Sequence, residues 1–231
     1  MKKLNIVLFL LLSTVALNAQ RPERGFLTDI EGNVYQTIVI GHQEWMAENL
    51  KTTTYNNGTK IPTVTEDSEW LSLSSGAYCW YKNNESHSDI YGALYNWFAV
   101  NTGMLCPDGW RVPSDDEWKY LEAFADTKYG MGDPVWDKSG FRGQDVGQGL
   151  MSRSGWKLDR NGTDILGFSA LPGGERLKGS HSMGSNGFWW TRTENDATSA
   201  WFRGLIYGME DISRDTHPKK MGFAVRCLRN E

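Results

Sequence analysis

Two acidic clusters are the clearest places where the sequence gathers side chains that could do chemistry. They are Asp115-Asp116-Glu117 and Glu194-Asn195-Asp196. The first cluster follows Ser114, which forms a Ser-x-x-Glu capping box with Glu117. Acidic residues in the first turn of a helix also interact favourably with its dipole. Helix capping therefore explains the first cluster, and no site is required there.

The second cluster, Glu194-Asn195-Asp196, allows two interpretations. It lies between two predicted strands, and Asn and Asp favour turns because their side chains hydrogen-bond to the local backbone. The same side chains offer oxygen ligands to Ca²⁺, but such a site takes about six to eight oxygens. A turn is the favoured interpretation, and a Ca²⁺ site is the alternative.

No other pattern predicts catalysis or a cofactor. The histidines at 42, 87, 181 and 217 are far apart and lack metal-ligand spacing. His181 lies between two serines, but no Gly-x-Ser-x-Gly motif surrounds it. Neither a P-loop nor a dinucleotide-binding glycine motif occurs. These observations favour a protein without a cofactor that is not an enzyme, although an active site assembled in space would escape them.

Eleven tryptophans are spread through the chain. Large aromatic side chains bury about 150–250 Å² each, so most should form the core of a domain rich in loops. Some could instead line a ligand surface. Trp190 and Trp201 are the candidates for such a surface, together with the residues of the second acidic cluster.

The predicted elements indicate an α+β domain. Alternating apolar residues predict a β-hairpin over 33–46, and helical spacing predicts short helices over 91–100 and 114–126. The last third is expected to hold three strands, at 188–193, 200–207 and 222–228. A hairpin, then helices, then strands is the order typical of an α+β fold with short elements and long loops.

The N-terminus is typical of an exported protein. Two lysines precede an apolar run that ends at Ala19, which predicts a signal peptide over residues 1–19 and a mature domain over 20–231. No cysteine lies at this junction, so a lipoprotein is not expected. Without Lys2 and Lys3, 22 basic and 28 acidic residues remain, a net charge of −6. This charge disfavours nucleic-acid binding, and no later segment is apolar enough to span a membrane.

Cys79, Cys106 and Cys227 allow three disulfide pairings. An oxidising compartment favours a disulfide, and the odd number leaves one thiol over. The apolar surroundings of Cys79 suit a buried free thiol. The alternative in which all three thiols are reduced stays open.

Several ordered segments resemble the Fibrobacter succinogenes major paralogous domain family. The match covers nearly the whole mature chain, and its motifs are specific in combination. They include Gly-His-Gln-Glu-Trp-Met-Ala-Glu-Asn-Leu at 41–50, Tyr-Gly-Ala-Leu-Tyr-Asn-Trp at 91–97, Cys-Pro-Asp-Gly-Trp-Arg-Val-Pro-Ser-Asp-Asp-Glu-Trp at 106–118, Gly-Phe-Ser-Ala-Leu-Pro-Gly-Gly at 167–174 and Val-Arg-Cys at 225–227.

The segment 111–118 and the predicted terminal strand also resemble the C-type-lectin-like superfamily, which includes the formylglycine-generating enzymes. The resemblance implies a single C-type-lectin-like domain. Those enzymes need a closely spaced cysteine pair before the terminal strand, and no cysteine lies between Cys106 and Cys227. The Glu-Pro-Asn motif of lectin sugar sites is absent as well. In lectin-like folds the terminal strand packs near a helix from the first half, which favours a Cys106–Cys227 disulfide.

These observations leave three classes of function. The favoured one is a binding module that recognises a glycan or a protein and is secreted, periplasmic or on the surface of a Gram-negative cell. The second is an enzyme of unknown reaction on a formylglycine-generating-enzyme-like scaffold. The third is a structural component of an envelope or adhesin assembly. Fold-level analogy alone does not choose among them.

Overall fold

A five-stranded sheet gathers segments from both ends of the chain. The computed structural model describes residues 24–230, so the predicted signal peptide lies outside the described residues. The strand order is β1-β2-β3-β13-β6. The strands are β1 (Arg24–Thr28), β2 (Val34–Ile40), β3 (Gln43–Met46), β6 (Trp110–Arg111) and β13 (Leu228–Arg229). Strands β2 and β3 form the predicted hairpin, with Ile38 opposite Trp45.

The predicted terminal strand over 222–228 is much shorter in the structure. Only Leu228 and Arg229 form a regular strand, and Leu228 pairs with both Trp45 and Arg111. The preceding residues make single bridges to other segments, such as Phe223 with Tyr95. Residues 221–228 are all buried. The segment therefore crosses the interior of the domain. Its residues are apolar because they are buried there, and not because they form a long regular strand.

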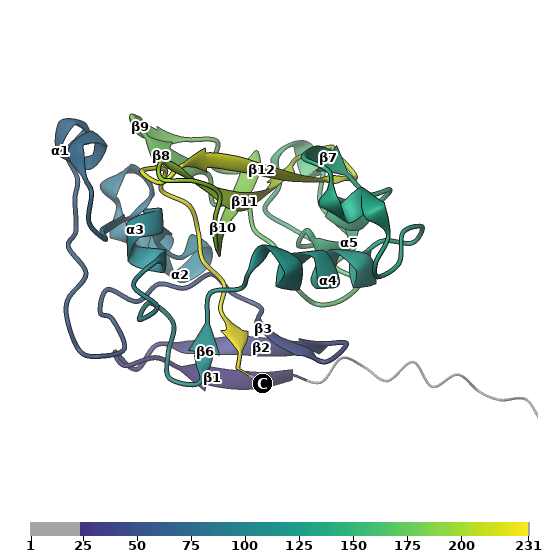
Figure 1. Cartoon of the computed structure of the whole chain (residues 1–231), viewed down its shortest axis with the longest axis horizontal. Helices are drawn as coiled ribbons and strands as arrows, with labels where there is room; N and C mark the ends of the chain where they lie inside the picture. The colour runs from purple at the N-terminus through teal and green to yellow at the C-terminus, as the bar shows by residue number, and fades with distance from the viewer. Residues whose placement is uncertain (1–23, 231) are drawn as a thin grey trace, which may run out of the picture.

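A second, four-stranded antiparallel sheet contains most of the last third of the chain. Its order is β10-β11-β12-β7. The strands are β7 (Gly140–Arg142), β10 (Asn186–Glu194), β11 (Ser199–Ile206) and β12 (Ile212–Pro218). Strands β10 and β11 confirm two of the predicted strands. A small hairpin of β8 (Glu175–Leu177) and β9 (Gly179–His181) comes between β7 and β10 in the chain, and Figure 1 shows it beside β10–β12.

Helix α4 (Asp115–Ala125) lies between the two sheets (Figure 1). Its capping box is complete, because Ser114 accepts the Glu117 backbone N–H while the Glu117 carboxylate accepts the Ser114 N–H. Trp118 packs edge to face against Trp45 at 5.1 Å between ring centroids, and its ring lies 6.3 Å from that of Trp189. The helix thus connects the two sheets through a tryptophan core.

The helix predicted over 91–100 is divided in the structure. Residues 94–95 instead form β5 (Leu94–Tyr95), which pairs with β4 (Tyr78–Cys79), and only α3 (Trp97–Val100) is helical. Gly92, at a φ of 72°, ends α2 (Ser88–Tyr91). The Asn96 side chain then accepts the Ala99 N–H and caps α3. Two local stop and start signals therefore override the helical spacing.

The remaining helices are short. They are α1 (Asp67–Ser72) and α5 (Val146–Leu150), with 3-10 turns η1 (Tyr81–Asn83), η2 (Glu85–His87), η3 (Pro134–Asp137) and η4 (Lys157–Asp159). Within residues 24–230, no helix combines the length and apolar character needed to cross a bilayer. With two antiparallel sheets and these helices, the architecture is α+β.

Candidate functional site

The Glu194-Asn195-Asp196 cluster forms the turn between β10 and β11. One oxygen of Asp196 accepts the Thr198 N–H at 2.7 Å and the Ser199 N–H at 2.9 Å. These hydrogen bonds, the Thr198 N–H first, hold the pKa of Asp196 well below its usual range. Glu194 pairs with Lys219. In the part of the chain that the structure describes, no three His, Cys, Asp or Glu side chains converge as a metal site would require.

The two tryptophan candidates lie on opposite faces of the second sheet. Trp190 is fully buried, and its indole N–H donates to the Tyr95 carbonyl at 2.9 Å. It is therefore a core residue, and the prediction that Trp190 contacts a ligand is wrong. Trp201 is half-buried, and the Arg214 guanidinium lies 3.7 Å from its ring centroid. The structure does not bring these tryptophans together with the acidic turn as one surface.

The cysteines make a single disulfide. It joins Cys106 to Cys227, the pair favoured by the resemblance, with the two Cα atoms 5.9 Å apart. Cys79 is a buried free thiol. Burial raises the pKa of Cys79 to about 11, so it stays protonated at neutral pH and does not act as a nucleophile.

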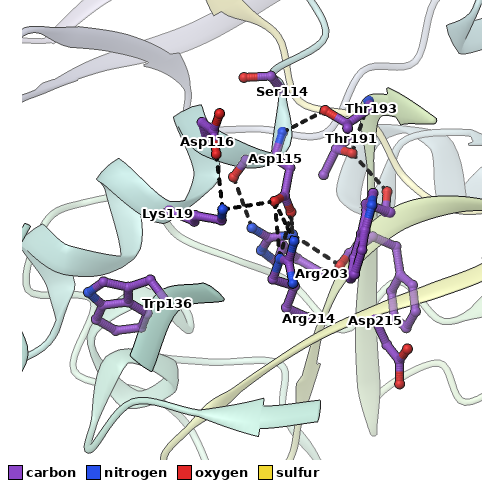
Figure 2. A network of polar contacts seen from close by, with 12 residues as sticks. Ser114, Asp115, Asp116, Lys119, Trp136, Thr191, Thr193, Arg203, Arg214 and Asp215 are labelled. Carbon is purple, nitrogen blue, oxygen red and sulfur yellow. Dashed lines mark hydrogen bonds and ion pairs between the residues drawn. The ribbon is translucent and has the colours of Figure 1, made fainter. Parts of the chain in front are cut away.

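Asp115 belongs to a buried ionic network, which helix capping did not predict. Its carboxylate lies 2.7 Å from Arg203 of β11 and 2.7 Å from Arg214 of β12, and Lys119 lies 3.3 Å away. Figure 2 shows both arginines reaching the carboxylate from the sheet, while Asp215 points away. Burial alone would raise the pKa of Asp115, but the two arginines outweigh it and hold the pKa well below its usual range.

Glu122, two helical turns further along α4, extends this network. It is fully buried and pairs with Arg203 and with Arg142 of β7. Each carboxylate thus has two arginine partners, as buried charges require. The network joins α4 to the sheet, and its acceptors are already occupied by protein donors. It is a structural element rather than a binding site.

The opposite face of the same sheet opens into a groove of about 510 Å³. Residues on β8, β9, β10 and the end of β12 form it, with Met221 from the crossing segment. We call it the β8–β12 groove. It is lined by Glu175, Leu177, Lys178, His181, Phe188, His217, Pro218 and Met221.

The Phe188 ring lies on the floor of the β8–β12 groove, and buried aromatic rings pack behind it. The half-buried Phe188 ring stacks on Phe223 at 5.2 Å between centroids. Phe202 lies 5.2 Å from Phe223 and 4.8 Å from His217. Strand pairing explains this arrangement, because Phe188, Phe202 and His217 alternate onto one face of the sheet while Arg203 and Arg214 take the other.

Ionisable side chains converge on this apolar floor. Glu175 and His181 lie directly opposite each other in the β8–β9 hairpin. Burial raises the pKa of Glu175 above its usual 4.5, against the opposing charge of His181. Burial lowers the pKa of His217 below its usual 6.5, against Asp215. An apolar cavity with a few convergent titratable groups of shifted pKa is typical of a ligand site.

The residues of the groove carry no sequence signal as a group. Glu175 and His217 are far apart in the chain, and none of the lining residues belongs to a motif with known spacing. The strand alternation of 186–194 could have placed Phe188 on the face of Trp190. The pairing of Glu175 with His181 depends on a tight hairpin turn at Lys178 for which the sequence has no clear signal.

Comparison with known proteins identifies the family. Residues 38–229 match the model of the Fibrobacter succinogenes major domain, so the match includes the groove and both sheets except β1 and the start of β2. No curated protein and no solved structure matches the chain. Since the match extends over most of the sequence, the chain belongs to the Fibrobacter succinogenes major domain family.

Proposed function

We propose that this protein is an exported, non-catalytic binding module with a C-type-lectin-like fold that recognises a glycan in the β8–β12 groove. The observation that carries the proposal is the groove itself, with an aromatic floor and ionisable groups at its edge. Sugar rings present an apolar face and a hydroxylated edge, which are complementary to such a surface. The C-type-lectin-like fold is proposed because segment 111–118 and the terminal segment resemble that superfamily in sequence.

The size of the groove favours a small or chain-like ligand. Its volume of about 510 Å³ falls within the roughly 300–1,000 Å³ of typical small-molecule sites. A stable protein partner would need about 800 Å² from each side, well beyond this one groove. A glycan is therefore preferred over a protein, which remains an outcome of the test.

Export is part of the proposal because the sequence favours it. The predicted signal peptide would leave a mature chain that starts near Gln20 and is secreted, periplasmic or at the cell surface. The Cys106–Cys227 disulfide suits such an oxidising compartment. Intact-mass analysis of the protein from its native host should give an N-terminus near Gln20, and retention of Met1 would contradict export with cleavage.

A glycan array probed with residues 20–231 tests the ligand. Binding should be lost or fall by about tenfold or more in Phe188→Ala, since a central aromatic contact commonly contributes that much. Phe26→Ala is the matched control, because Phe26 is 76% exposed on the other sheet. Absence of glycan binding, or equal binding by both variants, would contradict the proposal.

One observation favours an enzyme as the second candidate. Glu175 and His217 line one groove with pKa values shifted in opposite directions, a pattern that also occurs in acid–base catalysis. Incubation of the bound glycan with the protein distinguishes the two functions. Mass spectrometry should recover the glycan unchanged from a binding module, whereas cleavage that is lost in Glu175→Gln would identify an enzyme.

A further inference from the structure

Glu175 differs from the buried carboxylates within residues 24–230. Asp115 and Glu122 each have two arginine partners, and Asp29 accepts a hydrogen bond from the Tyr35 hydroxyl. Glu175 is half-buried at the groove, yet within residues 24–230 no donor lies within hydrogen-bond or ion-pair distance of its side chain. In the free protein this half-buried carboxylate relies on water for its hydrogen bonds, and a ligand with donors can replace that water.

His217 shares this condition. Its ring packs between Phe202 and Phe223, at 4.8 Å and 5.8 Å between centroids. No hydrogen bond from the described part of the chain reaches its ring nitrogens. The groove thus holds the Glu175 carboxylate and the His217 imidazole, both without protein partners in the described residues, together with the Phe188 ring. A ligand that supplies hydrogen-bond donors at its edge would satisfy them.

We infer that the groove selects neutral sugars, whose adjacent hydroxyls donate to Glu175 while the apolar face of the ring lies on Phe188. The inference rests on the proposed function and names its substrate class. A carboxylate can accept two parallel hydrogen bonds, and hydrogen bonds to an ionised acceptor are about twice as strong as neutral ones.

Glu175 also excludes acidic sugars. The carboxylate of a uronic acid would lie next to the half-buried carboxylate of Glu175, and such repulsion is a common means of rejecting a competing ligand. Lys178 and His181 at the rim would attract an acid, but both are exposed. Exposed charges interact weakly because water screens them. The half-buried Glu175 therefore decides the selectivity.

Matched oligosaccharide pairs test this inference. The probes are gluco- and manno-tetrasaccharides and their glucurono- and mannurono- counterparts, measured by calorimetry at neutral pH. The wild type should prefer the neutral member of a pair by about tenfold or more. In Glu175→Gln the preference should shrink to about twofold, since the charge is removed and the shape is kept. Glu210→Gln, an exposed control in the turn between β11 and β12, should keep the wild-type preference.

The outcomes separate the inference from the proposed function. Binding that is lost in Phe188→Ala, but is equal for neutral and acidic sugars or unchanged in Glu175→Gln, would overturn the selectivity and leave the glycan site standing. Absence of binding to every sugar would overturn both. Thermal unfolding of each variant checks that it is folded, so that a loss of binding reports on the groove.

Discussion

The two faces of the β10–β12 sheet differ in whether their ionisable side chains have partners within the protein. On the face toward α4, Arg203 and Arg214 are buried and paired with the carboxylates of the helix. On the face toward β8, Glu175 and His217 have no protein partners in the described part of the chain. Neighbouring residues of one strand, such as Phe202 and Arg203, contribute to both faces.

This difference indicates that the paired face stabilises the fold, whereas the unpaired face is available to a ligand. A buried charge without a partner is expensive, so a closed face must satisfy every charge internally. A face that awaits a ligand can leave its polar groups unpaired because water occupies the groove in the meantime. The paired charges join α4 to one face of the sheet, and this closed face supports the groove on the other.

The largest expected effect is on the closed face. Glu122→Gln should lower the free energy of unfolding by about 3–5 kcal/mol, because it leaves the buried Arg142 without a carboxylate and Arg203 with Asp115 alone. Chemical denaturation measures this loss. Asp116→Asn is the control, since the exposed Asp116 pairs only with Lys119 and should change stability by about 0.5 kcal/mol or less. Equal effects of the two variants would contradict a structural role for the network.

The disulfide should have the next largest effect, and it involves neither face of the sheet. The double variant Cys106→Ser and Cys227→Ser removes a link between residues 121 positions apart. The unfolding free energy should fall by about 2–4 kcal/mol. Glycan affinity of the folded fraction should not change. Cys79→Ser is the matched single-thiol control, and non-reducing peptide mapping that joined Cys79 to either partner would show that the pairing is wrong.

The smallest expected effect is a pH dependence on the open face. Burial lowers the folded-state pKa of His217 below 6.5, so the folded protein prefers the neutral ring. The contribution of His217 to the free energy of unfolding is fully present above about pH 6.5. It is lost as the pH falls through the lowered pKa of the folded state. In His217→Phe, which keeps the ring, the unfolding free energy should fall less between about pH 7 and pH 5. Identical slopes in both proteins would contradict this account.

The sequence predicted the elements whose signals are local. The capping box at Ser114 and Glu117 predicted α4 to within a residue at each end, and alternation predicted the hairpin of β2 and β3. The helix over 91–100 was wrong in its first half, because helical spacing cannot reveal that Asn96 caps a new helix. The resemblance to lectin-like folds favoured the Cys106–Cys227 disulfide, which spacing alone left open.

The site could not be predicted because its parts meet only in the folded chain. The ionic role of Asp115 depends on two arginines about 90–100 residues away. Trp190 gave no sign of whether it faced the core or solvent, since both faces of its strand carry large side chains. The β8–β12 groove depends on how β8, β9, β10 and β12 come together in space, which no spacing in a single sequence reveals.

The position of β13 has a consequence for how the chain matures. Leu228 lies between β3 and β6 and pairs with both, so the first sheet stays divided until that residue has left the ribosome. A nascent chain lacking it exposes two strand edges and holds an unpaired Cys106. The first sheet is therefore completed only after synthesis has reached Leu228, and under the proposal of export this delay would keep the chain unfolded for translocation.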